Sequence, residues 1–158
     1  MIKQITKAIL IFCMLLPIGC GYKIIDKTKQ NNFVIAEVNS TGDRRINYKI
    51  KNNLSFNQEN SSQNILNLRL DTQKIKTIKE KNIKNQIIKY TISVVVDIKF
   101  NLINSKKIHN IKSSRNGDYL VGKVHASTLS NEKRLIDSLA ENISDDIIKK
   151  ISLVINDL

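Results

Sequence analysis

The segment Tyr90-Thr91-Ile92-Ser93-Val94-Val95-Val96-Asp97-Ile98-Lys99-Phe100-Asn101-Leu102 alternates apolar with mainly polar side chains along its whole length. Successive side chains of a β-strand point to opposite faces of the sheet. The alternation therefore predicts a strand with one buried face and one face in water. At 3.3 Å per residue this strand would be about 43 Å long.

Three further segments have strand patterns. Residues 66–71 alternate leucine with polar residues, and after a turn at Asn104-Ser105 residues 106–115 repeat the alternation more weakly. Residues 33–38 (FVIAEV) form a short, nearly continuous apolar run, which is typical of a buried strand. We therefore expect four strands, of which the last three are antiparallel neighbours.

Two segments have the helical period. Residues 39–43 have the composition of a turn and a helix N-cap. In the helix that follows, apolar residues recur at four-residue spacing: Ile46, Ile50 and Leu54. Ser130 or Asn131 is expected to cap a second helix that ends near Ile155, with Glu132 in its first turn, where a negative charge suits the helix dipole. Its apolar stripe comprises Leu135, Ile136, Leu139, Ala140, Ile143, Ile147, Ile151 and Val154.

The predicted order is therefore β-α-β-β-β-α, with one apolar face on each element. Such elements bury their apolar faces against one another, so we expect an α+β fold in which two helices pack on one face of a four-stranded sheet. The other face is left for water or a partner. A single domain is expected over residues 33–158.

The first twenty residues have a different character. Two lysines precede an uncharged apolar run from Ala8 to Leu16, and Gly19-Cys20 follows it. This order is typical of a secretory signal, and the run is shorter than the roughly 20 residues of a membrane-spanning helix. Gly19-Cys20 resembles the bacterial lipobox, in which the cysteine receives a diacylglycerol and a fatty acid. We predict a lipoprotein signal peptide at 1–19, lipidation of Cys20 and a tether at 20–32; the alternative is an uncleaved core or interfacial segment.

The composition excludes several classes of protein. The 158 residues include 26 basic and 14 acidic residues, and at 41% hydrophobic the chain is too apolar for a disordered basic tail. Two cysteines supply neither a disulfide framework nor a cysteine-based zinc site. His109 and His125 lack further ligands at metal-binding spacing and fit surface positions, and Asp145-Asp146 fits a solvated helix face. We expect no catalytic residue, no metal and no cofactor apart from the lipid on Cys20.

Basic charge is concentrated between Asp71 and Lys89. This segment holds six lysines: Lys74, Lys76, Lys79, Lys81, Lys84 and Lys89. On a long hairpin these ammonium groups would bind phosphate-bearing polyanions as point charges, and the equally weighted alternative is a solubilising loop. The export signal and the absence of aromatic residues among them argue against nucleic acid as the partner.

Several short motifs, taken in order, resemble the LPS-assembly lipoprotein (LptE) family of the lipopolysaccharide (LPS) transport machinery. The lipobox is followed by Cys20-Gly21-Tyr22-Lys23, and residues 90–96 are similar to the family's third strand. Ser113-Ser114-Arg115 with Tyr119 looks like the end of its fourth strand. Residues 126–143 look like the start and the core of its final helix.

This resemblance implies a fold of two helices on a four-stranded sheet and a non-enzymatic function. Members are lipid-anchored plugs inside the outer-membrane β-barrel LPS translocon (LptD), on the periplasmic side of the outer membrane, and they bind LPS. By the same resemblance Lys84, at the tip of the hairpin between the second and third strands, and Lys123 are candidate LPS-phosphate-binding residues. Lys81 is a further candidate because it lies near that tip. The alternative is a periplasm-facing lipoprotein that binds peptidoglycan or regulates an envelope enzyme.

Overall fold

The computed structural model describes residues 33–56 and 64–157, which form four strands and two helices. In chain order these are β1 Phe33–Gly42, α2 Arg44–Phe56, β2 Asn64–Lys81, β3 Ile87–Leu102, β4 His109–Leu120 and α3 His125–Asn156. The predicted α+β fold in the order β-α-β-β-β-α is confirmed. The predicted signal peptide, the tether and Cys20 lie outside the described residues.

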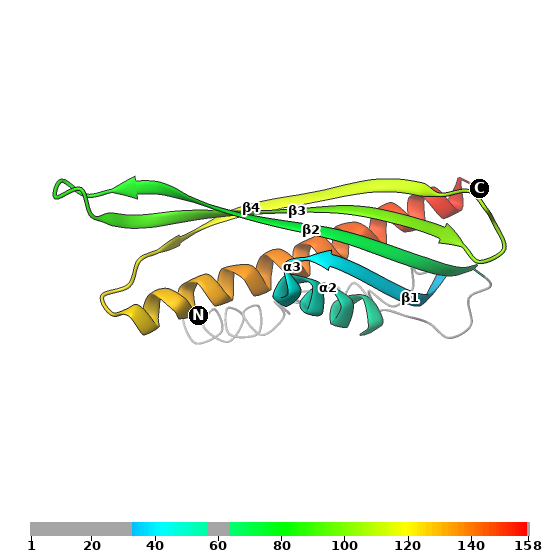
Figure 1. Ribbon diagram of the computed structural model, residues 1–158, viewed down its shortest axis with the longest axis horizontal. Helices are drawn as coiled ribbons and strands as arrows, with labels where there is room; N and C mark the ends of the chain where they lie inside the picture. The colour runs from blue at the N-terminus through cyan, green and yellow to red at the C-terminus, as the bar shows by residue number, and fades with distance from the viewer. Residues whose placement is uncertain (1–32, 57–63, 158) are drawn as a thin grey trace, which may run out of the picture.

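The strands lie in the sheet in the order in which they follow along the chain. β1 runs parallel to β2 and is joined to it through α2, whereas β2, β3 and β4 are antiparallel neighbours. Both helices lie on one side of the sheet, with α3 running along most of its length and α2 beside α3 under β1 (Figure 1). Within residues 33–56 and 64–157, no helix covers the other face of the sheet.

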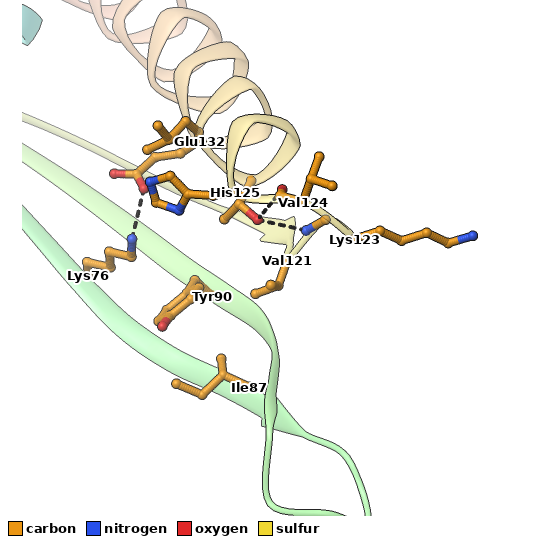
Figure 2. Close-up of a pocket in the computed structure, with 11 residues that line it drawn as sticks. Lys76, Ile87, Tyr90, Val121, Lys123, Val124, His125 and Glu132 are labelled. Carbon is orange, nitrogen blue, oxygen red and sulfur yellow. Dashed lines mark hydrogen bonds and ion pairs between the residues drawn. The ribbon is translucent and has the colours of Figure 1, made fainter.

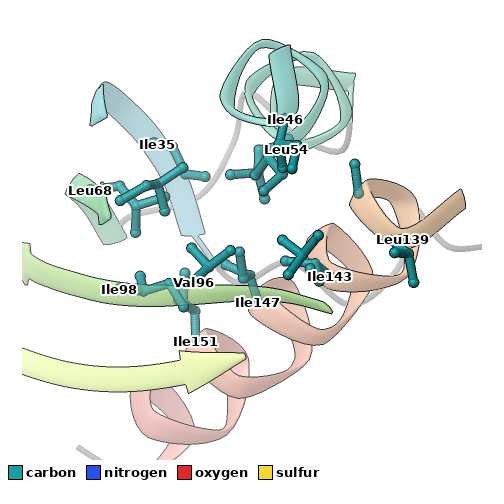
Figure 3. Close-up of a cluster of buried hydrophobic side chains, with 14 of the residues drawn as sticks. Ile35, Ile46, Leu54, Leu68, Val96, Ile98, Leu139, Ile143, Ile147 and Ile151 are labelled. Atoms are coloured by element: carbon teal, nitrogen blue, oxygen red, sulfur yellow. The ribbon is translucent and has the colours of Figure 1, made fainter. Parts of the chain in front are cut away.

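The core lies between the sheet and the two helices (Figure 3). Its members come from the periodic positions that the sequence indicated: Ile46, Ile50 and Leu54 of α2, Leu66, Leu68 and Leu70 of β2, Ile92 to Phe100 of β3, and Ile136 to Ile155 of α3. The buried β3 residues are every second one, Ile92, Val94, Val96, Ile98 and Phe100. Burial of each such side chain contributes about 1.5–3 kcal/mol, so this stripe fixes the register of the sheet.

The junction between β1 and α2 contains a helix cap and a glycine in the left-handed region. Oδ1 of Asp43 accepts hydrogen bonds from the backbone N–H groups of Arg45 and Ile46, both at 3.1 Å, so the N-cap predicted within residues 39–43 is Asp43. Gly42 has φ +91°. The prediction of a turn over residues 39–42 is wrong, because these residues extend β1 and pair with β2 as far as Thr72.

The strands extend further than their apolar patterns do. β2 continues from the expected 66–71 to Lys81 and pairs with β3, although its residues from Gln73 onward are exposed. β4 begins at His109 and continues to Leu120, where the expected strand covered 106–115. Hydrogen bonds to neighbouring strands determine where β2 and β4 end, and a hydropathy period does not detect these bonds.

Helix α3 begins six residues earlier than expected, and neither Ser130 nor Asn131 caps it. Its N-cap is Val124, without a side-chain cap. Nδ2 of Asn131 instead donates to the carbonyl of Leu120 at 2.9 Å and ties the helix to the end of β4. Glu132 consequently lies beyond the first turn. Leu129, the one large apolar residue of the added segment, is exposed, so no apolar stripe marks the true start.

The uncovered face of the sheet is largely polar. In β3 it presents Thr91, Ser93, Asp97, Lys99 and Asn101, together with the apolar Val95. Among the described residues, no helix is both long enough and apolar enough to cross a membrane.

Candidate functional site

The far half of β2 and the start of β3 form a hairpin that projects beyond the rest of the sheet (Figure 1). β1 ends opposite Thr72 and β4 ends opposite Lys89, so the last part of the hairpin has two strands only. Its tip lies at the same end of the molecule as the loop between β4 and α3. The six predicted lysines are therefore carried by this hairpin, as expected.

Asparagine side chains close the tip of the hairpin. The N–H of Asn82 donates to the carbonyl of Gln86 at 2.9 Å, and Oδ1 of Asn82 accepts from the N–H groups of Lys84 and Gln86. Asn85 has φ +60°, a left-handed conformation that asparagine tolerates better than most residues. The turn is thus defined by side-chain to backbone hydrogen bonds, and Lys84 is held at its apex.

Four of the six hairpin lysines are neutralised by carboxylates. Nζ of Lys74 lies 3.2 Å from Asp43, and Nζ of Lys89 lies 2.8 Å from Glu80. The other two pairs are Lys76–Glu132, at 2.8 Å, and Lys79–Asp118. These pairs are not apparent in the sequence, because three of the four carboxylates belong to β4, α3 or the β1–α2 junction.

Lys81 and Lys84 are the two hairpin lysines that make no ion pair within residues 33–56 and 64–157. Both are exposed, and Nζ of Lys81 donates to the neutral Oδ1 of Asn85 at 3.0 Å. Lys123 is exposed in the loop between β4 and α3, and its ammonium group points away from the protein (Figure 2). The fold thus brings the three candidate phosphate-binding lysines to one end of the molecule.

A pocket of about 360 Å³ lies between the hairpin and the first turns of α3 (Figure 2). Its polar lining includes Lys76, Tyr90, His125, Thr128 and Glu132, and its apolar lining is Ile87, Val121, Val124 and Leu129. Lys123 lies at its rim. The sequence alone does not indicate this pocket, because its residues come from β2, β3, the loop between β4 and α3, and α3 itself.

The polar side of this pocket is an ion pair over two stacked tyrosines. Oε2 of Glu132 accepts hydrogen bonds at 2.8 Å from both Nζ of Lys76 and the hydroxyl of Tyr119. Nζ of Lys76 also lies 4.4 Å from the ring centroid of Tyr90, which stacks on Tyr119 at 5.6 Å. The cation thus satisfies one carboxylate and one aromatic face at the same time.

These contacts shift the pKa values of the three groups. The hydrogen bond from Lys76 lowers the pKa of Glu132 below its usual value, against the effect of burial. Burial alone would lower the pKa of Lys76, but its contacts with Glu132 and Tyr119 outweigh it and raise that pKa. Burial raises the pKa of the Tyr119 hydroxyl. At neutral pH the ion pair is therefore fully charged and the phenol is neutral.

The two histidines, His109 and His125, lie at the starts of β4 and α3. His109 opens β4 and stacks on Phe100 at 5.2 Å, so it is half-buried and not the surface residue that was expected. His125 is the first residue of α3. Among the described residues, no group of three or more His, Cys, Asp or Glu side chains could hold a metal ion.

Asp146 does not lie on a solvated face, so that expectation is wrong. Its carboxylate accepts a hydrogen bond from Ser113 at 2.7 Å and pairs with Lys150 at 2.9 Å and Arg115 at 3.3 Å. Burial would raise its pKa, but these hydrogen bonds and charges lower it. Asp146 of α3 therefore binds Ser113 and Arg115 of β4 and has a structural role.

No protein-family model matches the chain, and no curated protein sequence matches it either. Several solved structures do match the fold of the chain. Rare lipoprotein B from Shewanella oneidensis aligns with a TM-score of 0.59 over 77% of this chain and 97% of its own, at 13% identity. The chain shares the fold of rare lipoprotein B. A candidate lipoprotein from Caulobacter crescentus aligns with a TM-score of 0.60 over 82% of this chain and 94% of its own, at 11% identity.

Proposed function

We propose that this chain is an outer-membrane lipoprotein, anchored through Cys20 on the periplasmic side, that plugs and helps to assemble the LPS-export β-barrel (LptD) and binds LPS without catalysing a reaction. The observation that carries the proposal is the projecting hairpin, on which only the tip lysines, Lys81 and Lys84, lack an ion pair within the described chain. A fold shared with two proteins named as lipoproteins supports the anchor.

The charge distribution of the hairpin favours a phosphate-bearing ligand at its tip. Lysines along the stem are paired with carboxylates, so an anion that approached the stem would have to displace those partners. At the tip Lys81 and Lys84 can offer their ammonium donors directly. The phosphates of lipid A are ligands of this chemistry, and Lys123 would contact the same ligand from the neighbouring loop.

The uncovered face of the sheet supports a location inside a barrel. The lumen of a transmembrane β-barrel is polar, whereas its outer wall is apolar. Thr91, Ser93, Asp97 and Asn101 on this face can exchange hydrogen bonds with a polar wall. The apolar faces of all six elements are used by the core of the domain itself.

Co-purification tests the proposal. The chain is recovered through a C-terminal tag from detergent-solubilised outer membranes, and a stoichiometric β-barrel in the eluate is the expected result. A peptidoglycan synthase or other envelope enzyme in place of the barrel would overturn the plug in favour of an envelope regulator. Labelling with a fatty-acid probe tests the anchor, and unchanged labelling of a Cys20→Ala variant would exclude it.

A further inference from the structure

The end of the molecule opposite the hairpin tip carries an exposed group of isoleucines and lysines. Ile103 and Ile108 bound the turn between β3 and β4 and are 52% and 62% exposed. Ile65, at the start of β2, is 43% exposed and accepts a 2.9 Å hydrogen bond from the N–H of Ile103 at its carbonyl. Lys106 and Lys107 lie within the turn, are exposed, and make no ion pair within the described part of the chain.

This end is also where the chain enters the domain. Phe33 pairs with Asn64 in the parallel register of β1 and β2, so β1 begins beside the start of β2 and near the β3–β4 turn (Figure 1). Cys20 precedes Phe33 by 13 residues, a span of at most about 45 Å. The hairpin tip lies the whole length of β2, about 60 Å, from this end. A lipid on Cys20 would therefore allow the β3–β4 turn to reach the bilayer, because the chain enters the domain beside this turn.

We propose that the β3–β4 turn docks on the phospholipid surface beside the anchor. Ile103 and Ile108 enter the interfacial layer, and the ammonium groups of Lys106 and Lys107 contact anionic headgroups. This inference depends on the Cys20 anchor of the proposed function and not on the barrel, the LPS or the hairpin lysines.

The chemistry of the turn matches that occupant. Isoleucine side chains gain free energy when they leave water for the acyl boundary, and adjacent lysines are attracted to an anionic surface within a Debye length. Two or three isoleucines would bind a membrane only weakly by themselves. The anchor makes docking an intramolecular step, so a weak patch is sufficient. Docking places the β3–β4 turn at the periplasmic surface of the membrane, with the hairpin tip at the opposite end of the domain.

Tryptophan fluorescence tests the docking, because the chain has no tryptophan of its own. The mature acylated chain carrying Ile108→Trp is reconstituted into vesicles of phosphatidylethanolamine and phosphatidylglycerol, with and without brominated acyl chains. The matched control is Ile83→Trp, at the fully exposed hairpin turn. Docking predicts that the Ile108→Trp reporter shifts to shorter wavelength and loses most of its emission to bromine, while the Ile83→Trp reporter keeps its emission.

A charge-reversed pair completes the test. Lys106→Glu with Lys107→Glu should restore much of the emission of the Ile108→Trp reporter, whereas Lys81→Glu with Lys84→Glu should not. Equal quenching of both reporters, or quenching that both charge reversals leave unchanged, would overturn the docking. A reporter that is blue-shifted but insensitive to bromine would also overturn it, since the chain itself would then cover the turn. Intact mass reports the acyl group separately, so an acylated but unquenched chain contradicts this inference alone.

Discussion

Nζ of Lys76 and Oε2 of Glu132 lie 2.8 Å apart and join the hairpin of the sheet to helix α3. The two residues are separated by 56 positions in the chain. Their side chains are 39% and 18% exposed, so solvent screens the pair only in part. The contact therefore links the stem of the basic hairpin to the N-terminal half of α3.

Removing this ion pair should destabilise the protein modestly. A double-mutant cycle with Lys76→Met and Glu132→Gln should give a coupling free energy of about 0.5–1 kcal/mol after allowance for solvent screening. Chemical denaturation of the four proteins measures it. The matched control is Lys112–Asp97, at 3.5 Å and with side chains 64% and 47% exposed, where the coupling should be close to zero. Equal couplings in the two cycles would contradict this role for Lys76.

The same carboxylate predicts a dependence of stability on pH. Folding lowers the pKa of Glu132 below its usual 4.5, so its contribution is fully present above that value and is lost as the pH falls through the folded pKa. Between neutral pH and about pH 3 the unfolding free energy of Glu132→Gln should therefore fall less steeply than that of the wild type. The residual slope arises from Asp43, Asp118 and Asp146, whose pKa values folding also lowers. Parallel curves would exclude Glu132 as a contributor.

The tip lysines should affect binding but not stability. Lys81→Glu with Lys84→Glu removes two exposed charges that make no ion pair within the described residues, so the free energy of unfolding should change by less than about 1 kcal/mol. Binding of LPS should weaken about tenfold, and its dependence on salt should become smaller.

The control for this variant carries the same change of charge far from the tip. Lys99→Glu with Lys149→Glu is suitable, because both side chains are exposed. Lys150 is unsuitable, since it pairs with Asp146. Isothermal titration with purified LPS at two salt concentrations makes the comparison. If the two double variants lose affinity equally, net charge alone governs binding and the hairpin has no special role.

Gly42→Ala should be the most destabilising small substitution in the β1–α2 junction. Gly42 has φ +91°, and a Cβ atom there would lie 1.9 Å from the carbonyl oxygen of Thr72, which also accepts the N–H of Asp43. We expect a loss of about 2–4 kcal/mol in thermal or chemical unfolding.

Gly117→Ala is the matched glycine for this measurement. Its added Cβ would meet Cδ1 of Leu135 at 2.6 Å, and this methyl group is the end of a flexible side chain that can rotate away. The cost should therefore be smaller than at Gly42. An equal loss at both positions would show that backbone overlap at Thr72 is not the dominant effect.

The parts of the structure that could be predicted are those encoded by residues close together in the sequence. The alternation from Ile92 to Phe100 and the four-residue spacing from Ile46 to Leu54 are local patterns, and both are buried as expected. Residues 73–81 have no alternation, so no hydropathy period predicts a strand there. They form a strand because β3 supplies hydrogen-bonding partners for them. The start of α3 was missed for a similar reason, since contacts with Gly122, Val124 and Leu120 hold its first turns in place of a side-chain cap.

The sequence by itself determined the class and order of the elements, the buried face of each, and the concentration of lysines between the second and third strands. Burial of apolar side chains is encoded by a period of two or four residues, which a linear sequence displays. Only the tertiary structure decided which lysines remain unpaired. Asp43, Asp118 and Glu132 neutralise Lys74, Lys79 and Lys76 across the fold, and Lys81 and Lys84 lie beyond the reach of these carboxylates. Electrostatic pairing depends on distance in space, and for these residues that distance is set by the sheet and by α3.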